Sequence, residues 1–104
     1  EIKIDSRIQE INFGKFEGIV NNEEFQYYKQ NHGLHYPGGE SLFQVVYRVY
    51  SFLEELENKY PDKNILVVCH GGIVRVIHSY FQDMTNEELM TWLPENCCIQ
   101  SYEK

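Results

Sequence analysis

The stretch NILVVCHGGIVRVIHSYF, residues 64–81, combines the residue types with the clearest potential for chemistry. An apolar run ends in His70, and Gly71 and Gly72 lead directly into a helical pattern. A histidine at the carboxyl end of a buried strand lies where open α/β sheets bind ligands. Glycines let an anion approach the backbone, and the N–H groups of the helix that follows favour negative charge. His70 and Gly71 are therefore candidate phosphate-binding residues, although a tight turn capped by a histidine would use the same residue types.

A second candidate group lies in DSRIQEINFGKFEG, residues 5–18, where Arg7, Glu10 and Glu17 surround two glycines. A glutamate beside a phosphate can act as a general acid when burial or the charge of the phosphate raises its pKa. Taken alone, the stretch is more typical of a solvated loop.

Neither a metal nor another cofactor is predicted. The four histidines and three cysteines form no C-x-x-C or H-x-x-x-H motif. The cysteines are odd in number, and Cys97 and Cys98 are adjacent, which suits a disulfide poorly. A reducing cytoplasm is therefore the expected location.

Length and charge exclude several classes of protein. With 104 residues, 42% of them hydrophobic, the chain can form one domain with a core. Its net charge of -7 argues against electrostatically driven binding of nucleic acid. Because no apolar run approaches the ~20 residues of a membrane span, no membrane contact is expected.

The most regular pattern predicts a long helix over residues 41–60. Its apolar face comprises Leu42, Val45, Val46, Val49, Leu53, Leu56 and Tyr60. Ser41 and Gln44 have the spacing of a capping box, and Pro61 ends the pattern. The preceding residues 36–41, YPGGES, could form a plain loop or a rim over a ligand.

Further helices and strands complete the expected architecture. Strands are predicted over residues 1–4, 64–70 and 97–103, and shorter helices over residues 21–32, 72–81 and 85–92. The run ILVVC is apolar on both faces, which is typical of a central strand covered by helices. The order helix, strand, helix, strand predicts an α/β fold with a right-handed crossover.

Three ordered motifs, quoted as RIQEINFGKFEG, YPGGES and VVCHGGIVRVI, together resemble those of the histidine phosphatase superfamily, the phosphoglycerate mutase-like proteins. The resemblance covers essentially the whole chain, and Phe16 stands where tryptophan is common. It implies a three-layer sandwich with a mostly parallel central sheet flanked by helices. It also implies hydrolysis of a phosphate monoester through a phosphohistidine, with a small phosphorylated metabolite as the expected partner. By position, His70 matches the histidine that binds phosphoryl oxygens, and Glu10 the acid that protonates the leaving oxygen.

The sequence departs from the family pattern in one respect. The arginine-histidine-glycine motif that carries the family's nucleophile does not occur, and before His70 only His32 and His35 are histidines. The chain is therefore expected to be the C-terminal portion of a single domain, over residues 1–104, with its nucleophile upstream. Alone it is predicted to be inactive, and to need the missing segment or self-association to complete the sheet beside residues 65–69.

Three alternatives remain at this point. One is phosphoryl transfer of the phosphoglycerate mutase type, although His-Gly-Gly favours a phosphatase. The second is an inactive module that binds phosphate and serves regulation. The third is an unrelated nucleotide-binding α/β domain, which lacks a glycine-rich fingerprint here.

Overall fold

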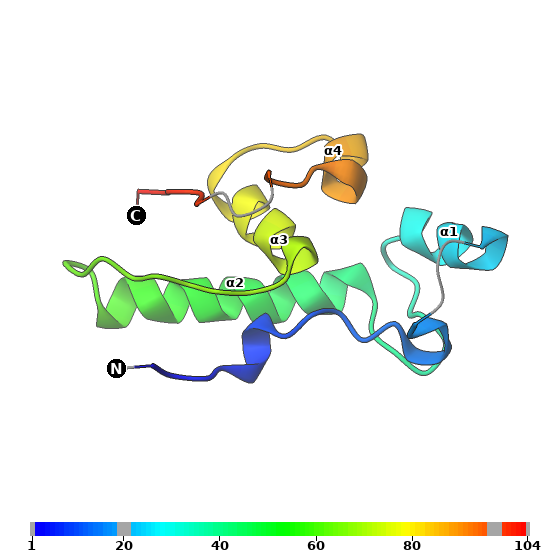
Figure 1. Cartoon of the computed structure of the whole chain (residues 1–104), viewed down its shortest axis with the longest axis horizontal. Coiled ribbons are helices and arrows are strands. Elements are labelled where there is room, and N and C mark those ends of the chain that lie inside the picture. Colours follow the sequence, from blue (N-terminus) through cyan, green and yellow to red (C-terminus); the bar gives the residue numbers. More distant parts are fainter. Residues whose placement is uncertain (1, 19–21, 96–98, 104) are drawn as a thin grey trace.

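The computed structural model describes residues 2–18, 22–95 and 99–103, and these form helices connected by extended segments (Figure 1). In chain order the elements are the short 3-10 helices η1 (Ser6–Ile8) and η2 (Gly14–Phe16) and the α-helices α1 (Glu23–Gln30), α2 (Leu42–Lys59), α3 (Gly71–Phe81) and α4 (Asn86–Thr91). Helix α2 follows the long axis of the molecule. It contacts both η1 and α3, while α4 packs on α3.

Helix α2 confirms the longest predicted element and its capping box. The Ser41 hydroxyl accepts a hydrogen bond from the Gln44 N–H, and the Gln44 side chain accepts one from the Ser41 N–H. The helix ends one residue before Tyr60, which precedes Pro61. Its apolar face meets that of α3 in one core, formed by Val45, Val49, Phe52, Leu53, Ile73, Val76 and Ile77. Burial of each such side chain contributes about 1.5–3 kcal/mol.

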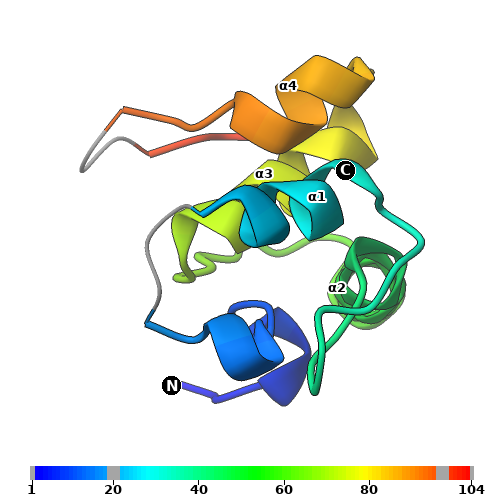
Figure 2. The ribbon, with the colours of Figure 1, turned by 90° about the vertical axis from the view of Figure 1, so that its right-hand side faces the viewer.

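The shorter predicted helices also form. Helix α3 begins directly at Gly71, and its buried residues face α2. The second predicted capping box is present, because Thr85 and Glu88 exchange hydrogen bonds at the start of α4. Helix α1 is capped by the side chain of Asn22, which accepts from the Phe25 N–H. Figure 2 looks along α2 and shows α3 and the η1–η2 segment on different sides of it.

The predicted α/β sandwich with a mostly parallel central sheet is wrong for the residues described here, because none of them forms a β-strand. Residues 64–70 run beside α2, but the backbone groups of residues 64–69 make no hydrogen bond with any described residue. Only one face of this segment packs on the core, through Val67 and Cys69. Leu66 and Val68 are 78% and 80% exposed. An apolar run predicts burial, whereas a strand also needs a partner strand.

The two terminal strand predictions are also wrong for the described residues. Residues 2–4 and 99–103 form no regular element. Cys97 and Cys98, which belong to the last predicted strand, lie outside the described residues. None of the described helices has the length and apolar character needed to cross a membrane.

Candidate active site

The Glu10 carboxylate lies against the first turn of α3. Its Oε1 accepts a hydrogen bond of 2.9 Å from the Ile11 N–H. A Cβ atom added to Gly72 would lie 2.9 Å from the same oxygen, so the carboxylate occupies space that any other residue at position 72 would fill. The fold therefore brings together two of the motifs singled out in the sequence, one from each half of the chain.

A cavity of about 390 Å³ opens beside this contact, and its volume is in the range of small-molecule sites. Glu10, Gly71, Gly72 and Arg75 form part of its wall. Burial lowers the pKa of Arg75 and the charge of Glu10 raises it, but a guanidinium remains protonated in either case. The Arg75 Nε–H donates to the Trp92 carbonyl at 2.7 Å, which holds the side chain against the cavity. Arg75 was not predicted as a site residue, because its position on a helix does not by itself show which way the side chain points.

His70 is the N-cap residue of α3. Its carbonyl accepts hydrogen bonds from the N–H groups of Ile73 and Val74, both at 3.0 Å. Its imidazole is exposed, makes no capping hydrogen bond and does not line the cavity. The N–H groups of Gly71 and Gly72 make no backbone hydrogen bond among the described residues. Thus Glu10 and Gly71 share the cavity, while the His70 side chain lies next to it along the chain.

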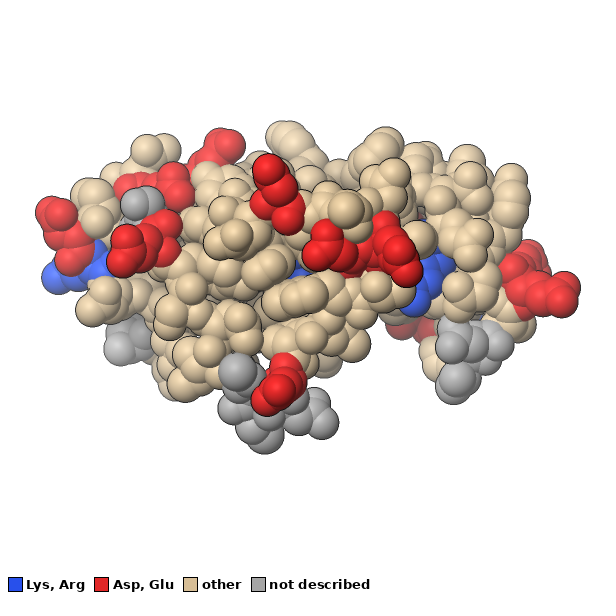
Figure 3. All heavy atoms as spheres, turned by 90° about the horizontal axis from the view of Figure 1, so that it is seen from above, with Lys and Arg blue, Asp and Glu red and all other residues tan. Residues whose placement is uncertain are grey.

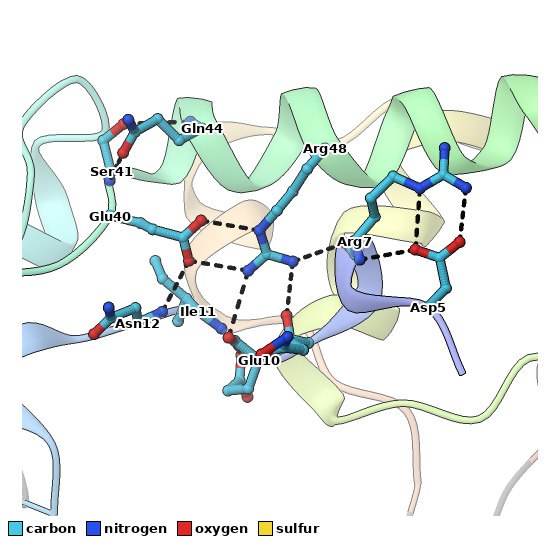
Figure 4. A network of polar contacts seen from close by, with 10 residues as sticks. Asp5, Arg7, Glu10, Ile11, Asn12, Glu40, Ser41, Gln44 and Arg48 are labelled. Carbon is cyan, nitrogen blue, oxygen red and sulfur yellow. Dashed lines mark hydrogen bonds and ion pairs between the residues drawn. The ribbon is translucent and has the colours of Figure 1, made fainter.

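Arg48 of α2 holds the backbone that carries Glu10 (Figure 4). Its Nη1 donates to the carbonyls of Arg7 at 2.7 Å and Gln9 at 2.8 Å, and its Nη2 donates to the Glu10 carbonyl at 3.4 Å. One guanidinium therefore satisfies three carbonyls at the end of η1 and in the irregular residues that follow it. Arg48 was not predicted as part of the site, although an arginine within an amphipathic helix is a usable signal.

Glu40 completes this network. Its carboxylate accepts from Arg48 Nε at 2.9 Å and from Arg48 Nη2 at 3.0 Å, and it also accepts from the Asn12 N–H at 2.9 Å. The hydrogen bonds from Arg48 lower the pKa of Glu40, and the Asn12 N–H acts in the same direction. The YPGGES loop therefore supports the Glu10 segment through its glutamate.

Glycines let the two loops interlock. Gly14 has φ +57°, and a Cβ there would overlap the Pro37 carbonyl. A Cβ on Gly39 would overlap the Asn12 carbonyl. The Lys15 N–H donates to the Pro37 carbonyl at 2.9 Å across this contact. These glycines therefore serve the packing of one loop against the other.

Two further candidates from the first motif have structural partners instead. Arg7 forms ion pairs with Asp5 at 2.7 Å and Glu55 at 2.8 Å. Glu17 accepts from the Phe13 N–H at 3.0 Å and is exposed. The described residues contain no group of three or more histidine, cysteine or acidic residues that could hold a metal ion.

Cys69, immediately before His70, is half-buried. Burial raises the pKa of its thiol, and the charge of Glu10 raises it further. Since the thiolate is the reactive form, this environment disfavours Cys69 as a nucleophile.

A family model described as "Histidine phosphatase superfamily (branch 1)" matches residues 1–103. The chain belongs to the histidine phosphatase superfamily. This confirms the resemblance drawn from the three motifs. No solved structure matches this histidine phosphatase chain.

Several curated relatives of the chain are named as fructose-2,6-bisphosphatases. A 6-phosphofructo-2-kinase/fructose-2,6-bisphosphatase of Aquarana catesbeiana is 40% identical over 68 residues, which are 64% of this chain and 14% of that protein. A probable fructose-2,6-bisphosphatase of Schizosaccharomyces pombe is 34% identical over 80 residues, 77% of this chain and 17% of that protein. The human 6-phosphofructo-2-kinase/fructose-2,6-bisphosphatase 1 is 31% identical over 90 residues, 79% and 18% respectively. The chain thus spans less than a fifth of these relatives' length.

Proposed function

We propose that this chain supplies the leaving-group acid and part of the phosphate site of a phosphate-monoester hydrolase. The observation that carries the proposal is the Glu10 carboxylate against Gly72, at the wall of a cavity that Arg75 also lines. The free N–H groups at the start of α3 and the arginine favour a bound phosphoryl group. The relatives' bisphosphatase names support hydrolysis over mutase-type transfer.

The reaction would proceed in two steps. A histidine nitrogen attacks phosphorus, the bond to the leaving oxygen breaks, and Glu10 gives that oxygen a proton. Water then attacks the phosphohistidine, the P–N bond breaks, and the Glu10 carboxylate takes the proton from water. The nucleophile would lie outside this chain, because R-H-G does not occur in it. His70 would donate a hydrogen bond to the phosphoryl oxygens, whose charge needs fixed donors in the transition state.

The test of Glu10 uses leaving groups of different acidity in the protein at its natural length. Glu10→Gln should lower kcat/KM for an alkyl phosphate about 100-fold or more, because the alkoxide needs a proton. For p-nitrophenyl phosphate, whose leaving group needs none, the loss should be below about 10-fold. Glu17→Gln is the control, since Glu17 is exposed and caps η2. Equal losses of the two substrates in Glu10→Gln would refute the role of general acid.

His70→Ala tests the phosphate site separately. Removal of a donor to the transition state should lower kcat with p-nitrophenyl phosphate by about 100-fold or more. Circular dichroism should show an unchanged helix content, because the imidazole makes no capping hydrogen bond. Near-normal turnover would exclude His70 from the site.

A further inference from the structure

Arg75 is held in the cavity wall through the Nε–H of its guanidinium. The cavity extends from α3 to α1, and Arg75 lines it together with Glu10, Gly71 and Gly72. Its Nε–H donates to the Trp92 carbonyl at 2.7 Å, whereas its Nη1 and Nη2 groups make no hydrogen bond with any described residue. A guanidinium fixed at Nε still presents its terminal N–H groups to a phosphoryl group. Whatever fixes the Trp92 carbonyl therefore also determines where these donors point.

The charge of Arg75 matters because the chain as a whole is acidic. Its net charge is -7, and acidic side chains predominate over basic ones on the face shown in Figure 3. Such a surface repels a phosphoryl group over distances of about 10 Å at 0.1 M ionic strength. Arg75 forms no ion pair with any described residue, whereas four other basic side chains do, namely Arg7, Lys15, Arg48 and Lys59. Its charge is therefore available to a ligand.

The residues that follow α4, Trp92 and Leu93, contact the N-terminal half of α3 at two points. Besides the carbonyl that holds Arg75, the Leu93 side chain lies against Gly71, where an added Cβ would be 3.2 Å from its Cδ2 atom. The Trp92 N–H donates to the Glu88 carbonyl at 2.8 Å, which ties this residue to α4. Its position relative to α3 depends in addition on what the indole ring contacts.

His78, one turn beyond Arg75 on α3, makes that contact. Its imidazole stacks on the Trp92 indole, with ring centroids 4.0 Å apart and an interplanar angle of 14°. The His78 Nδ1 shares a hydrogen bond of 2.7 Å with the Tyr102 hydroxyl, from the C-terminal segment. The Tyr102 ring in turn stacks on that of Phe81, at 4.7 Å and 11°. The imidazole is thus held at its edge and presents a face to Trp92.

We propose that His78 and Tyr102 are positioning residues of the phosphate site, because they fix Trp92, whose carbonyl orients Arg75. The inference rests on the proposed function, since it takes the cavity beside Glu10 as the place where the phosphoryl group binds. Neither His78 nor Tyr102 lines the cavity, so their effect on catalysis passes through Trp92 and Arg75. A group misplaced by about 1 Å can lower a rate by about 100-fold. Their contacts should therefore be visible in turnover.

Two pairs of variants test this inference in the protein at its natural length. Tyr102→Phe and its control Tyr50→Phe each remove a hydroxyl bonded to a side chain of α3, at 2.7 Å to His78 and at 2.8 Å to Ser79. His78→Ala and its control Ser79→Ala remove these two partners. With p-nitrophenyl phosphate, kcat/KM should fall about 10-fold or more in His78→Ala and about 3-fold or more in Tyr102→Phe.

The controls should each lose less than about 2-fold, because neither Tyr50 nor Ser79 belongs to the cavity wall that Arg75 lines. Equal losses in a variant and its control would overturn the inference, since destabilisation of α3 would then explain both.

A double-mutant cycle shows whether the loss passes through Arg75. Arg75→Met alone should lower kcat/KM about 100-fold or more, because the phosphoryl group loses a charged donor. In the Arg75→Met background, His78→Ala should cause a further loss of less than about 2-fold, since the group that it positions is already absent. The same loss from His78→Ala in both backgrounds would overturn the inference.

NMR of the Arg75 side chain separates this inference from the proposed function, because it requires no turnover. The Nε–H signal, assigned by its disappearance in Arg75→Met, should exchange slowly with water in the wild-type protein, since it is bonded to the Trp92 carbonyl. Exchange should be about 10-fold faster in His78→Ala and unchanged in Ser79→Ala. Equal exchange in the wild type and His78→Ala would overturn the inference, whatever the activity.

Absence of hydrolysis by the wild-type protein would refute the proposed function, and calorimetric titration with inorganic phosphate would then replace the kinetic test. Phosphate should bind the wild-type protein with a Kd about 10-fold or more below that of His78→Ala. Equal Kd values, or no binding of phosphate to the wild-type protein, would overturn the positioning role as well.

Discussion

The segment that carries Glu10 and the segment that leads to His70 both reach the start of α3, but they are held very differently. Arg48 and Glu40 fix residues 7–12 by charge-assisted hydrogen bonds, and glycines let the neighbouring loop pack closely. Residues 64–69 have one face on the core and no backbone hydrogen bond among the described residues. An irregular segment can thus be well positioned by side chains, whereas an extended segment depends on a neighbouring backbone for its hydrogen bonds.

The largest effect should come from removing the guanidinium that holds the first segment. Arg48→Met should lower the free energy of unfolding by about 2–4 kcal/mol, because three carbonyls lose this donor and the Glu40 carboxylate keeps only the hydrogen bond from Asn12. Denaturant unfolding of the protein at its natural length measures the change. Lys59→Met is the control, since that lysine is exposed and 3.9 Å from its partner, and it should cost below about 0.5 kcal/mol. Similar losses in the two variants would contradict the role assigned to Arg48.

Two glycine variants distinguish the effect of packing between the two loops from the effect of a positive φ angle. Gly14 and Gly18 both have positive φ, so alanine at either position costs about 1–2 kcal/mol. Only at Gly14 does a Cβ meet the opposite loop, while the space around Gly18 is open within 4 Å. Gly14→Ala should therefore be more destabilising than Gly18→Ala by about 1–3 kcal/mol in the same unfolding experiment. Equal costs would mean that the loops do not pack as described.

Acid should weaken the first segment through Glu40. Its pKa is lowered in the folded protein by Arg48, so the stabilisation is complete above the ordinary carboxyl pKa of 4.5 and is lost as pH falls through the folded value. The difference in unfolding free energy between wild type and Arg48→Met should shrink by about 1 kcal/mol below that pH. The other carboxylates are present in both proteins, so their contributions to the pH dependence cancel in this difference. A difference that stays constant from pH 7 to pH 3 would show that Glu40 does not contribute.

A substitution in the second segment, residues 64–69, should alter self-association of the chain and hardly change its free energy of unfolding. We propose that residues 1–104 expressed alone self-associate through the unpaired segment 64–69, because exposed apolar edges template pairing with another chain. Val68→Lys should lower the mass measured by light scattering, with a change in unfolding free energy below about 0.5 kcal/mol. Tyr47→Lys, at a comparably exposed position on α2, is the control. A monomeric wild-type polypeptide at all concentrations would refute this prediction.

Local patterns in the sequence determined the helices of this protein. The capping boxes at Ser41 and Thr85 and the apolar periodicity of residues 42–60 specify hydrogen bonds and contacts within a few residues, so they were read correctly. The order of the three motifs also identified the family. The motifs predicted His70, Gly71 and Glu10 for one site; Glu10 and Gly71 line the same cavity, whereas the His70 side chain does not.

Only the tertiary structure decided which residues meet. The contact of Glu10 with Gly72, the clamp of Arg48 on residues 7–10 and the cavity between α3 and α1 each join residues distant in sequence. The predicted strand at residues 64–70 was wrong for the same reason: its apolar composition was visible in the sequence, but β-structure also requires hydrogen bonds from a second strand. Helical bonds close within one turn, while strand pairing and cavity walls depend on the path of the whole chain.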